Sequence, residues 1–351
     1  MPRSLVYTQS PWEETYSEII DVRSPSEFAE DRIPGAINLP VLDDPQRAEV
    51  GTIYKQVDPF TARKLGAALV AKNIATHLQG HFAAKDKNYH PLVYCWRGGQ
   101  RSQSLATVLG AIGWQVTLLQ GGYKTYRTWV LQQLETLPPQ FTYRVLAGPT
   151  GSGKTRILRQ IQSLGAPVLD LEALANHRGS VLGEEWQLGP TPQPSQKYFE
   201  SLLVQTLRNL DRLSPVWVES ESNKIGALYL PPKLWERMKQ ASGIALEVPT
   251  AARIEWLLQE YPHLMQHPEL LKGKLQRLKY RYGGEKLAEW ELLIDAGNYP
   301  AFVADILDCH YDHAYRRSLH LSYPHIHQTF TLSSLDDAAI AASAAALLIH
   351  Q

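Results

Sequence analysis

The chain has 351 residues, of which 44% are hydrophobic and 20% charged, a composition typical of a globular protein large enough for two domains. Its 35 basic and 35 acidic residues balance, so contact with nucleic acid would require a local basic patch. Two cysteines cannot form a disulfide framework, and no run approaches the ~18 apolar residues of a membrane span. We therefore expect a cytoplasmic protein that has no membrane segment.

The first third of the chain alternates short apolar runs with helical patterns. Ser24-Pro25-Ser26-Glu27 follows one such run and has the residue types of a capping box, so a strand leads directly into a helix. Strands are expected at 19–22, within 33–40, at 92–95 and at 116–119, and helices at 60–74, 102–112 and from about 126 toward Pro138-Pro139. This alternation predicts an α/β domain with a parallel sheet over residues 1–137, and the diproline marks its end.

Cys95 lies where one of these strands ends and the next helix begins, in the run Cys95-Trp96-Arg97-Gly98-Gly99-Gln100-Arg101-Ser102. The N–H groups of a tight turn, the positive end of a helix and the nearby Arg97 and Arg101 all favour a thiolate. The alternative is an unreactive cysteine in the core. We predict that Cys95 is the reactive residue and that Arg97 and Arg101 bind an anion beside it.

Several motifs of this region resemble the rhodanese family in order and spacing: Asp21-Val22-Arg23, Glu27-Phe28, residues 33–40, the Cys95 loop and Gly121-Gly122. The resemblance implies that Cys95 carries sulfur as a persulfide that the loop N–H groups stabilise. Arg101 follows Cys95 by six residues, whereas the common rhodanese loop has its arginine after five. The resulting C-x5-R spacing is that of cysteine-dependent phosphatases, so phosphate-like substrates such as selenophosphate come into consideration, and a phosphatase remains an alternative.

The second half of the chain opens with a phosphate-binding motif. A strand at 143–147 runs into Gly148-Pro149-Thr150-Gly151-Ser152-Gly153-Lys154-Thr155, and a helical pattern follows. This is a complete G-x4-G-K-[ST] motif in its proper context. Its loop N–H groups and Lys154 would hold phosphate oxygens, and Thr155 could bind magnesium. The predicted phosphate-binding residues are Gly148, Gly151, Ser152, Gly153, Lys154 and Thr155.

Carboxylates follow two further strands of this half. Asp170, near the end of a strand expected at 167–172, is our candidate for a magnesium ligand with Thr155, and a carboxylate that starts a helix in solvent is the alternative. Glu219-Ser220-Glu221-Ser222 ends the next strand in the same way. With another strand at 243–248 and helices near 196–210, 232–240 and 250–260, the pattern predicts a P-loop α/β domain. Magnesium is the one cofactor that these residues suggest.

Beyond residue 248 only helical patterns are expected, ending in an alanine-rich helix at 335–350. A basic and aromatic cluster here suits contacts with phosphates and bases of RNA, or it forms a solvated helix face with tyrosines in the core. The RNA-binding candidates are Lys272, Lys274, Arg277, Lys279, Tyr280, Arg281 and Tyr282. The histidines at 263, 267, 310 and 313 are weak metal candidates because a zinc site requires a third or fourth ligand.

Over its whole length the chain resembles the tRNA 2-selenouridine synthase family, in which a rhodanese-like domain precedes a P-loop NTPase-like domain with a helical extension. The resemblance rests on the Cys95 run, on Gly121-Gly122-Tyr123-Lys124, on the P-loop and on residues 169–180. The predicted domains are therefore 1–137 and 138–351.

This resemblance implies a reaction in two stages at the wobble uridine of tRNA. Geranyl diphosphate first S-geranylates 2-thiouridine, and selenium from selenophosphate then replaces the geranylthio group. Our hypothesis is that Cys95 accepts the selenium as a perselenide and that the P-loop holds the diphosphate. The implied partners are a tRNA with 2-thiouridine and, transiently, a selenophosphate-producing enzyme. An ATP-dependent kinase or NTPase with a regulatory rhodanese-like sulfurtransferase domain is the main alternative, and an RNA-binding protein without chemistry is another.

Overall fold

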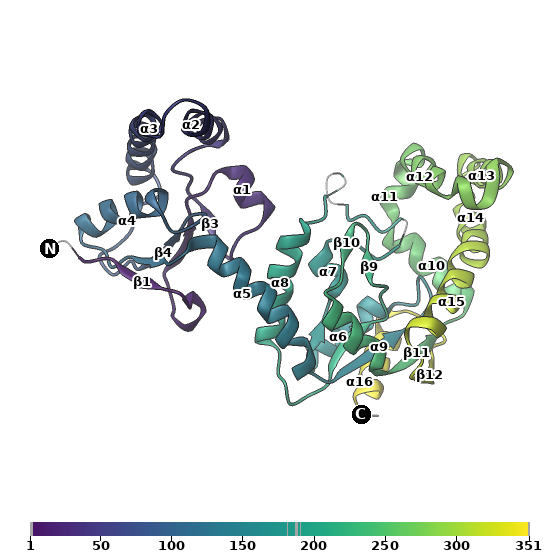
Figure 1. The fold of residues 1–351 in the computed structure, drawn as a ribbon. Coiled ribbons are helices and arrows are strands. Elements are labelled where there is room, and N and C mark those ends of the chain that lie inside the picture. The colour runs from purple at the N-terminus through teal and green to yellow at the C-terminus, as the bar shows by residue number, and fades with distance from the viewer. Residues whose placement is uncertain (1–2, 181, 187–188, 190, 350–351) are drawn as a thin grey trace. The chain divides into compact units, whose positions relative to one another are not determined.

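A computed structural model describes the fold (Figure 1) for residues 3–180, 182–186, 189 and 191–349. The chain divides into two compact units, the first formed by residues up to 133 with 195–205, and the second by 134–194 with the residues from 206 onward. Each unit contains a five-stranded sheet. The strand pairs of both sheets are parallel, so the predicted α/β class is confirmed in both.

The first sheet has the order β1-β5-β4-β2-β3, which places β4 in its middle. Every side chain of β4 is buried, as the apolar run predicts. Cys95 follows β4 directly and therefore lies at the carboxyl edge of the sheet, at its centre. The strands are β1 (Val6–Thr8), β2 (Glu18–Asp21), β3 (Ile37–Asn38), β4 (Pro91–Tyr94) and β5 (Thr117–Leu119).

Helices cover this sheet. The capping box predicted at Ser24 is present at the start of α1, where the Glu27 carboxylate accepts from the Ser24 N–H at 3.1 Å. A second capping box, between Asp43 and Gln46, starts a helix that we did not anticipate. The helices are α1 (Pro25–Glu30), α2 (Asp44–Gln56), α3 (Pro59–Gln79), α4 (Gln100–Ile112), α5 (Gly122–Thr136) and α8 (Gln196–Asn209), of which α8 belongs to this unit up to residue 205.

The second sheet has the order β12-β11-β6-β8-β7, with β6 in its middle. The P-loop follows β6, and the carboxylates of the Glu219 run follow its neighbour β8, so both open at the same edge. The strands are β6 (Tyr143–Ala147), β7 (Val168–Leu169), β8 (Val216–Glu219), β11 (Ser242–Glu247) and β12 (Ile326–Thr331). A small antiparallel pair, β9 (Lys224–Ile225) and β10 (Leu228–Tyr229), lies outside the sheet.

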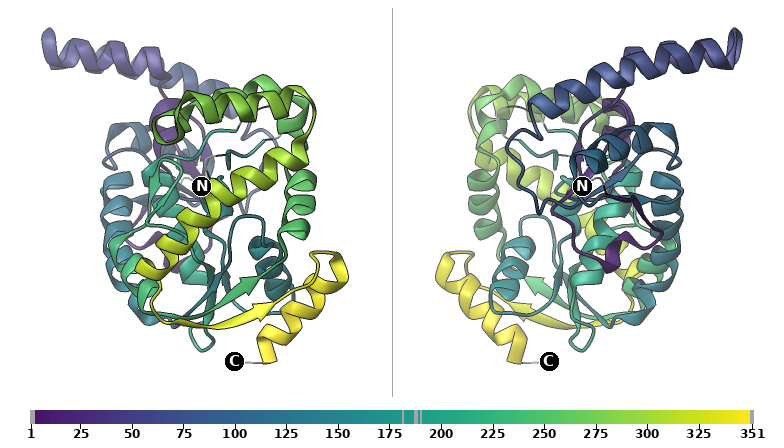
Figure 2. Two further views of the ribbon diagram at one scale, coloured as in Figure 1. Left: turned by 90° about the vertical axis from the view of Figure 1, so that its right-hand side faces the viewer. Right: turned by 90° about the vertical axis from the view of Figure 1, so that its left-hand side faces the viewer.

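The edge strand β12 corrects our expectation that the chain is only helical beyond residue 248. It pairs with β11 in parallel, with Phe330 opposite Leu246. Figure 2 shows β12 and the following helix α16 (Asp337–Ile349) in yellow at this edge. Only Ile326 and Phe330 are apolar within the strand, so the alternation that signals a strand was too weak to detect.

Several of the remaining helices of the second unit pack together around a separate small core. Leu271, Leu287, Trp290 and Phe302 are buried together there. The helices are α6 (Lys154–Ser163), α7 (Leu171–Ala175), α9 (Pro232–Gln240), α10 (Thr250–Glu260), α11 (Pro262–Gln266), α12 (Pro268–Leu275), α13 (Lys279–Asp295), α14 (Tyr299–Ile306) and α15 (His313–Ser322). Between α14 and α15 lies a π-helix, Leu307–Asp312, a wider turn that is rare and often found at functional sites. Among the helices of the described ranges, none is long and apolar enough to span a membrane.

Candidate functional site

Cys95 is held at the end of β4 by the starts of two helices. Its side chain is 3% exposed, and the Ser102 hydroxyl, from the first turn of α4, donates to its Sγ at 3.2 Å. The N–H of Tyr123 in α5 donates to the Cys95 carbonyl at 2.8 Å. Gly122 has φ +62°, and a Cβ there would come within 2.2 Å of the Cys95 carbonyl oxygen. The Gly121-Gly122 motif therefore lets α5 start directly against the cysteine loop.

The two arginines of the loop differ in environment. Arg97 is exposed. Arg101 forms a two-point ion pair with Glu27, with distances of 2.6 and 3.3 Å. Burial opposes ionisation of Glu27, but its hydrogen bond to Arg101 and the charge of Arg101 hold its pKa below the usual value. Arg101 is thus fixed as a cation near the loop, and its predicted contact with a substrate anion stays a prediction.

The P-loop has the conformation that its glycines allow. Gly151 and Gly153 have φ values of +79° and +76°, and Gly153 caps the amino end of α6. Lys154 folds back over the loop, where its Nζ donates to the Gly148 carbonyl at 2.8 Å. The Ser152 hydroxyl is buried and has no hydrogen-bond partner among the described residues. The predicted phosphate-binding residues therefore lie together in one loop around a helix start, which suits an anion.

An ion pair between Arg253 and Asp312 contacts the P-loop at the Thr150 carbonyl. Arg253 of α10 donates to the Thr150 carbonyl at 2.9 Å and to both carboxylate oxygens of Asp312 at 2.9 and 2.6 Å. Arg253 is 3% exposed. The sequence showed Asp312 only as part of a weak histidine cluster, because its partner Arg253 lies 59 residues away.

Three carboxylates face the P-loop from the ends of neighbouring strands. Oxygen atoms of Glu172, Glu219 and Glu221 lie within 4.8 Å of one another, and the Thr155 hydroxyl donates to Glu172 at 3.1 Å. Asp170 instead caps α7 through the Ala173 N–H at 2.8 Å, which is the alternative considered for it. Thr155 therefore contacts Glu172 and interacts with Glu219 as well, and the magnesium role expected of Asp170 stays a prediction.

The charges of this cluster repel one another. Burial, together with repulsion from Glu219 and Glu221, raises the pKa of Glu172 well above its usual value. Burial and the charge of Glu219 raise the pKa of Glu221 to about 7. Glu219 is 1% exposed, and its Oε1 has no partner within the described part of the chain. Hard oxygen donors with an orphaned buried oxygen fit a magnesium ion.

An open pocket joins the P-loop to these carboxylates. The space between its lining atoms is about 2160 Å³, its open side included. Its lining includes Gly148, Thr150, Gly151, Ser152, Gly153, Lys154, Thr155, Glu172, Arg178, Glu219, Glu221, His310, Tyr311 and Tyr315. The pocket therefore presents phosphate-binding groups and candidate metal ligands to one ligand.

The seven RNA-binding candidates differ in their surroundings. Lys272 pairs with Asp295 at 2.5 Å, and both Lys274 and Arg277 pair with Glu184. The Tyr282 hydroxyl donates to the Cys309 carbonyl and also lies 2.9 Å from His310 Nδ1. These four side chains therefore have partners within the protein, and the RNA contacts expected of them stay a prediction.

Lys279, Tyr280 and Arg281 remain at the start of α13, and the Tyr280 side chain is fully exposed. No ion pair of Lys279 or Arg281 occurs within the described ranges. The side chains at this tip therefore lack such ion pairs, and the RNA contact expected of the whole cluster stays a prediction.

The histidines have structural surroundings. His263 stacks on Trp186 with ring centres 5.2 Å apart, and Trp186 also contacts His267. Burial, with the charge of Arg281, lowers the pKa of His310. Among the residues that the structure describes, no histidine belongs to a cluster able to hold a metal.

Family comparisons agree with this arrangement. A model of the rhodanese-like domain matches residues 8–128, and a model described as the tRNA 2-selenouridine synthase AAA domain matches 141–334. With a cysteine loop after β4 and a P-loop after β6, the chain combines a rhodanese-like domain with a P-loop domain of the AAA type.

Named relatives specify the family. The chain is 35% identical to the tRNA 2-selenouridine synthase of Sulfurovum sp. (strain NBC37-1), over 89% of this chain and 90% of that protein. It is 38% identical to that of Nitrosomonas europaea, over 69% and 63% of the two chains, and 35% identical to that of Bdellovibrio bacteriovorus, over 77% and 74%. The chain therefore belongs to the tRNA 2-selenouridine synthase family, as its motifs predicted.

Proposed function

We propose that this chain converts 2-thiouridine at the wobble position of tRNA to 2-selenouridine through an S-geranylated intermediate. Its relatives are named as the synthases of that nucleoside in tRNA. The observation that carries the proposal is the presence in one chain of two loops with motifs typical of anion binding, one around Cys95 and one around Lys154. A two-stage reaction that releases diphosphate and then phosphate uses both.

The P-loop serves the geranyl step. The thiocarbonyl sulfur of the uridine attacks C1 of geranyl diphosphate, the carbon–oxygen bond breaks, and diphosphate leaves with the electron pair while the base loses its N3 proton. Loop N–H groups and Lys154 stabilise the charge that develops on the diphosphate. Thr155, Glu172 and Glu219 would hold magnesium, which supplies further positive charge beside the leaving group when bound.

The Cys95 loop serves the selenium step. Loop N–H groups, Arg97 and Arg101 bind the phosphate part of selenophosphate. Selenium in this donor is already at the oxidation level of selenide, so a perselenide on Cys95, as first expected, would require an oxidant that the reaction does not supply.

Attack of Cys95 on phosphorus balances without an oxidant. A sulfur–phosphorus bond forms, the selenium–phosphorus bond breaks, and hydrogen selenide leaves to displace geranylthiol from the base. Water then hydrolyses the phosphocysteine to phosphate and the free thiol. The C-x5-R spacing and the hydrogen bond from Ser102 to the sulfur suit such a phosphoryl transfer.

Mass spectrometry of nucleosides tests the proposal. A tRNA with 2-thiouridine is incubated with the protein and geranyl diphosphate, with and without selenophosphate, and we expect S-geranyl-2-thiouridine without the selenium donor and 2-selenouridine with it. Cys95→Ser should stop at the geranylated nucleoside, and Lys154→Ala should lose affinity for geranyl diphosphate. Turnover of ATP without any geranylated product would instead support the NTPase alternative.

A further inference from the structure

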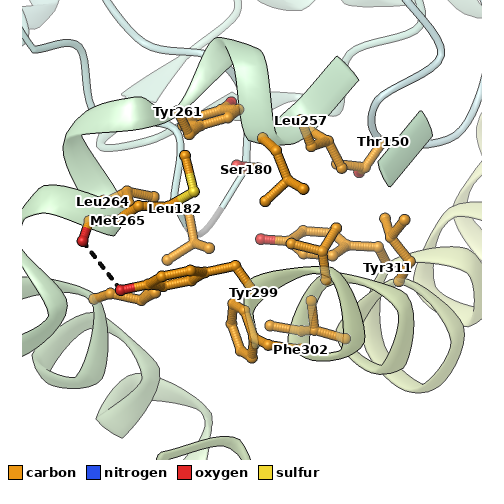
Figure 3. A pocket seen from close by; sticks show the side chains of 15 residues that line it. Thr150, Ser180, Leu182, Leu257, Tyr261, Leu264, Met265, Tyr299, Phe302 and Tyr311 are labelled. Atoms are coloured by element: carbon orange, nitrogen blue, oxygen red, sulfur yellow. Dashed lines mark hydrogen bonds between the residues drawn. The ribbon is translucent and has the colours of Figure 1, made fainter. Parts of the chain in front are cut away.

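A second cavity lies beside the P-loop pocket (Figure 3). The space between its lining atoms is about 550 Å³, its mouth included. The two cavities share part of their walls: Thr150, Ser180, Leu257, Tyr261 and Tyr311 line both. Since Thr150 is itself a P-loop residue, a ligand whose phosphates occupy the P-loop can extend directly into this second space.

The walls of the second cavity are apolar. They come from α10, α11, α12, α14 and the π-helix, and include Leu257, Leu258, Leu264, Met265, Leu271, Phe302, Val303, Ile306 and Leu307. Among the described residues no charged side chain lines it. A nucleoside would bring hydroxyl groups and ring nitrogens that need hydrogen-bond partners, and these walls offer few, whereas a hydrocarbon chain gains by leaving water.

We propose that this cavity is the subsite for the hydrocarbon chain of the prenyl diphosphate whose diphosphate is held by the P-loop. The inference rests on the proposed function, and it adds where the hydrocarbon chain lies and which residues limit the length of that hydrocarbon chain. The carbon attached to the diphosphate then lies near the shared wall, and the tail of the chain points away from the P-loop.

A hydrogen bond joins two helices at the end of the cavity away from Thr150. Figure 3 shows Thr150 at one end, and Leu264 and Met265 at the other, with the Tyr299 ring along the wall beside them. The Tyr299 hydroxyl donates to the Met265 carbonyl at 3.0 Å, which ties α14 to α11 across this end. The Tyr299 ring and the Met265 side chain therefore set the longest chain that fits.

Binding to the full-length protein tests the subsite, with inorganic diphosphate and the dimethylallyl, geranyl and farnesyl diphosphates as probes in titration calorimetry. Geranyl diphosphate should bind on the order of 1,000-fold more tightly than dimethylallyl diphosphate, because five more carbons leave water. Farnesyl diphosphate should bind no better than geranyl diphosphate, because its last carbons meet the Tyr299 ring and the Met265 side chain.

Two enlarging variants test the length limit independently. Tyr299→Leu and Met265→Ala should each raise the affinity for farnesyl relative to geranyl diphosphate by roughly tenfold. Tyr299→Phe is the matched control, because it loses the hydrogen bond but keeps the ring and should keep the wild-type preference. Circular dichroism establishes that each variant is folded.

The outcomes separate this inference from the function on which it rests. If the wild-type protein forms geranylated tRNA but binds the three prenyl diphosphates no better than inorganic diphosphate, the subsite is wrong and the function stands. If folded Tyr299→Leu and Met265→Ala both keep the wild-type ratio, the length limit is wrong. If no geranylated tRNA forms at all, the proposed function itself fails.

Discussion

Replacing Arg253 with methionine should weaken the support of the P-loop. The Arg253 side chain is 4% exposed and its partner Asp312 is 16% exposed, so the change leaves a mostly buried carboxylate without its cation. Loss of one partner of a buried pair costs about 3–5 kcal/mol, and we take the lower end because Asp312 retains some contact with water. The Thr150 carbonyl loses its hydrogen bond too, which adds roughly 1 kcal/mol.

The expected fall of roughly 3–4 kcal/mol in the free energy of unfolding of the second unit corresponds to a melting temperature lower by roughly 6–16 °C. Differential scanning calorimetry of the full chain measures it, with Arg159→Met as control, because Arg159 is 66% exposed and 3.8 Å from Asp170. The double variant of Arg253→Met with Asp312→Asn should be less destabilised than the two single changes together.

If the destabilisation of the double variant equals the sum of the two single variants within about 0.5 kcal/mol, Arg253 and Asp312 do not act as a pair. A wild-type melting temperature for Arg253→Met would refute the reasoning altogether. Affinity for inorganic diphosphate, measured on the same variants, reports whether the support is needed for the conformation of the P-loop.

Three further predictions concern other parts of the chain. Gly122→Ala should lower the yield of 2-selenouridine in nucleoside mass spectrometry and spare geranylation, because its Cβ would come within 2.2 Å of the Cys95 carbonyl. Burial lowers the pKa of His310, so below about pH 6.5 the unfolded chain binds more protons than the folded one and stability falls as the pH drops. Urea unfolding at pH 7 and pH 5 should show a smaller fall for His310→Gln, and an equal fall would count against this account. Tyr280→Ala should weaken tRNA binding by about 1–3 kcal/mol in a filter assay if a base stacks on this exposed ring, and unchanged affinity would exclude the tip of α13.

The features that the sequence predicted correctly are local ones. The capping box of Ser24 and Glu27, the buried run of β4, and the P-loop between β6 and α6 each depend on residues close in the chain. Residues that are neighbours in the chain determine each of them, and these local preferences agree with the overall fold. Motifs of this kind also carried the assignment to the family.

The features that sequence reasoning missed depend on distant partners. Arg101 meets Glu27 across 74 residues, and Arg253 meets Asp312 across 59. Lys274, an RNA-binding candidate, pairs with Glu184, which lies 90 residues away. Neither the pairing of β12 with β11 nor the apolar cavity has a local signal, because each is formed by segments that only the fold brings together.

Glu172 and Asp170 show how closely a helix start must be placed before the roles of its side chains can be predicted. Both follow β7, and only the start of α7 at Leu171 decides that Asp170 caps a helix while Glu172 faces Thr155. A shift of the helix start by two residues would place Glu172 at the cap instead, and sequence patterns do not place helix ends that closely.

The π-helix Leu307–Asp312 is the part of this helical run where chain length can change with least effect. A turn closed by i→i+5 hydrogen bonds holds one residue more than an α-helical turn, so deletion of one residue between Leu307 and Asp312 would leave an ordinary α-helix with both residues still on one face. The same deletion within α14 or α15 would instead rotate the following residues by roughly 100° about the helix axis. We therefore expect a one-residue deletion in the wide turn to keep Leu307 at the cavity and Asp312 at Arg253, whereas a deletion in a flanking helix would disturb them.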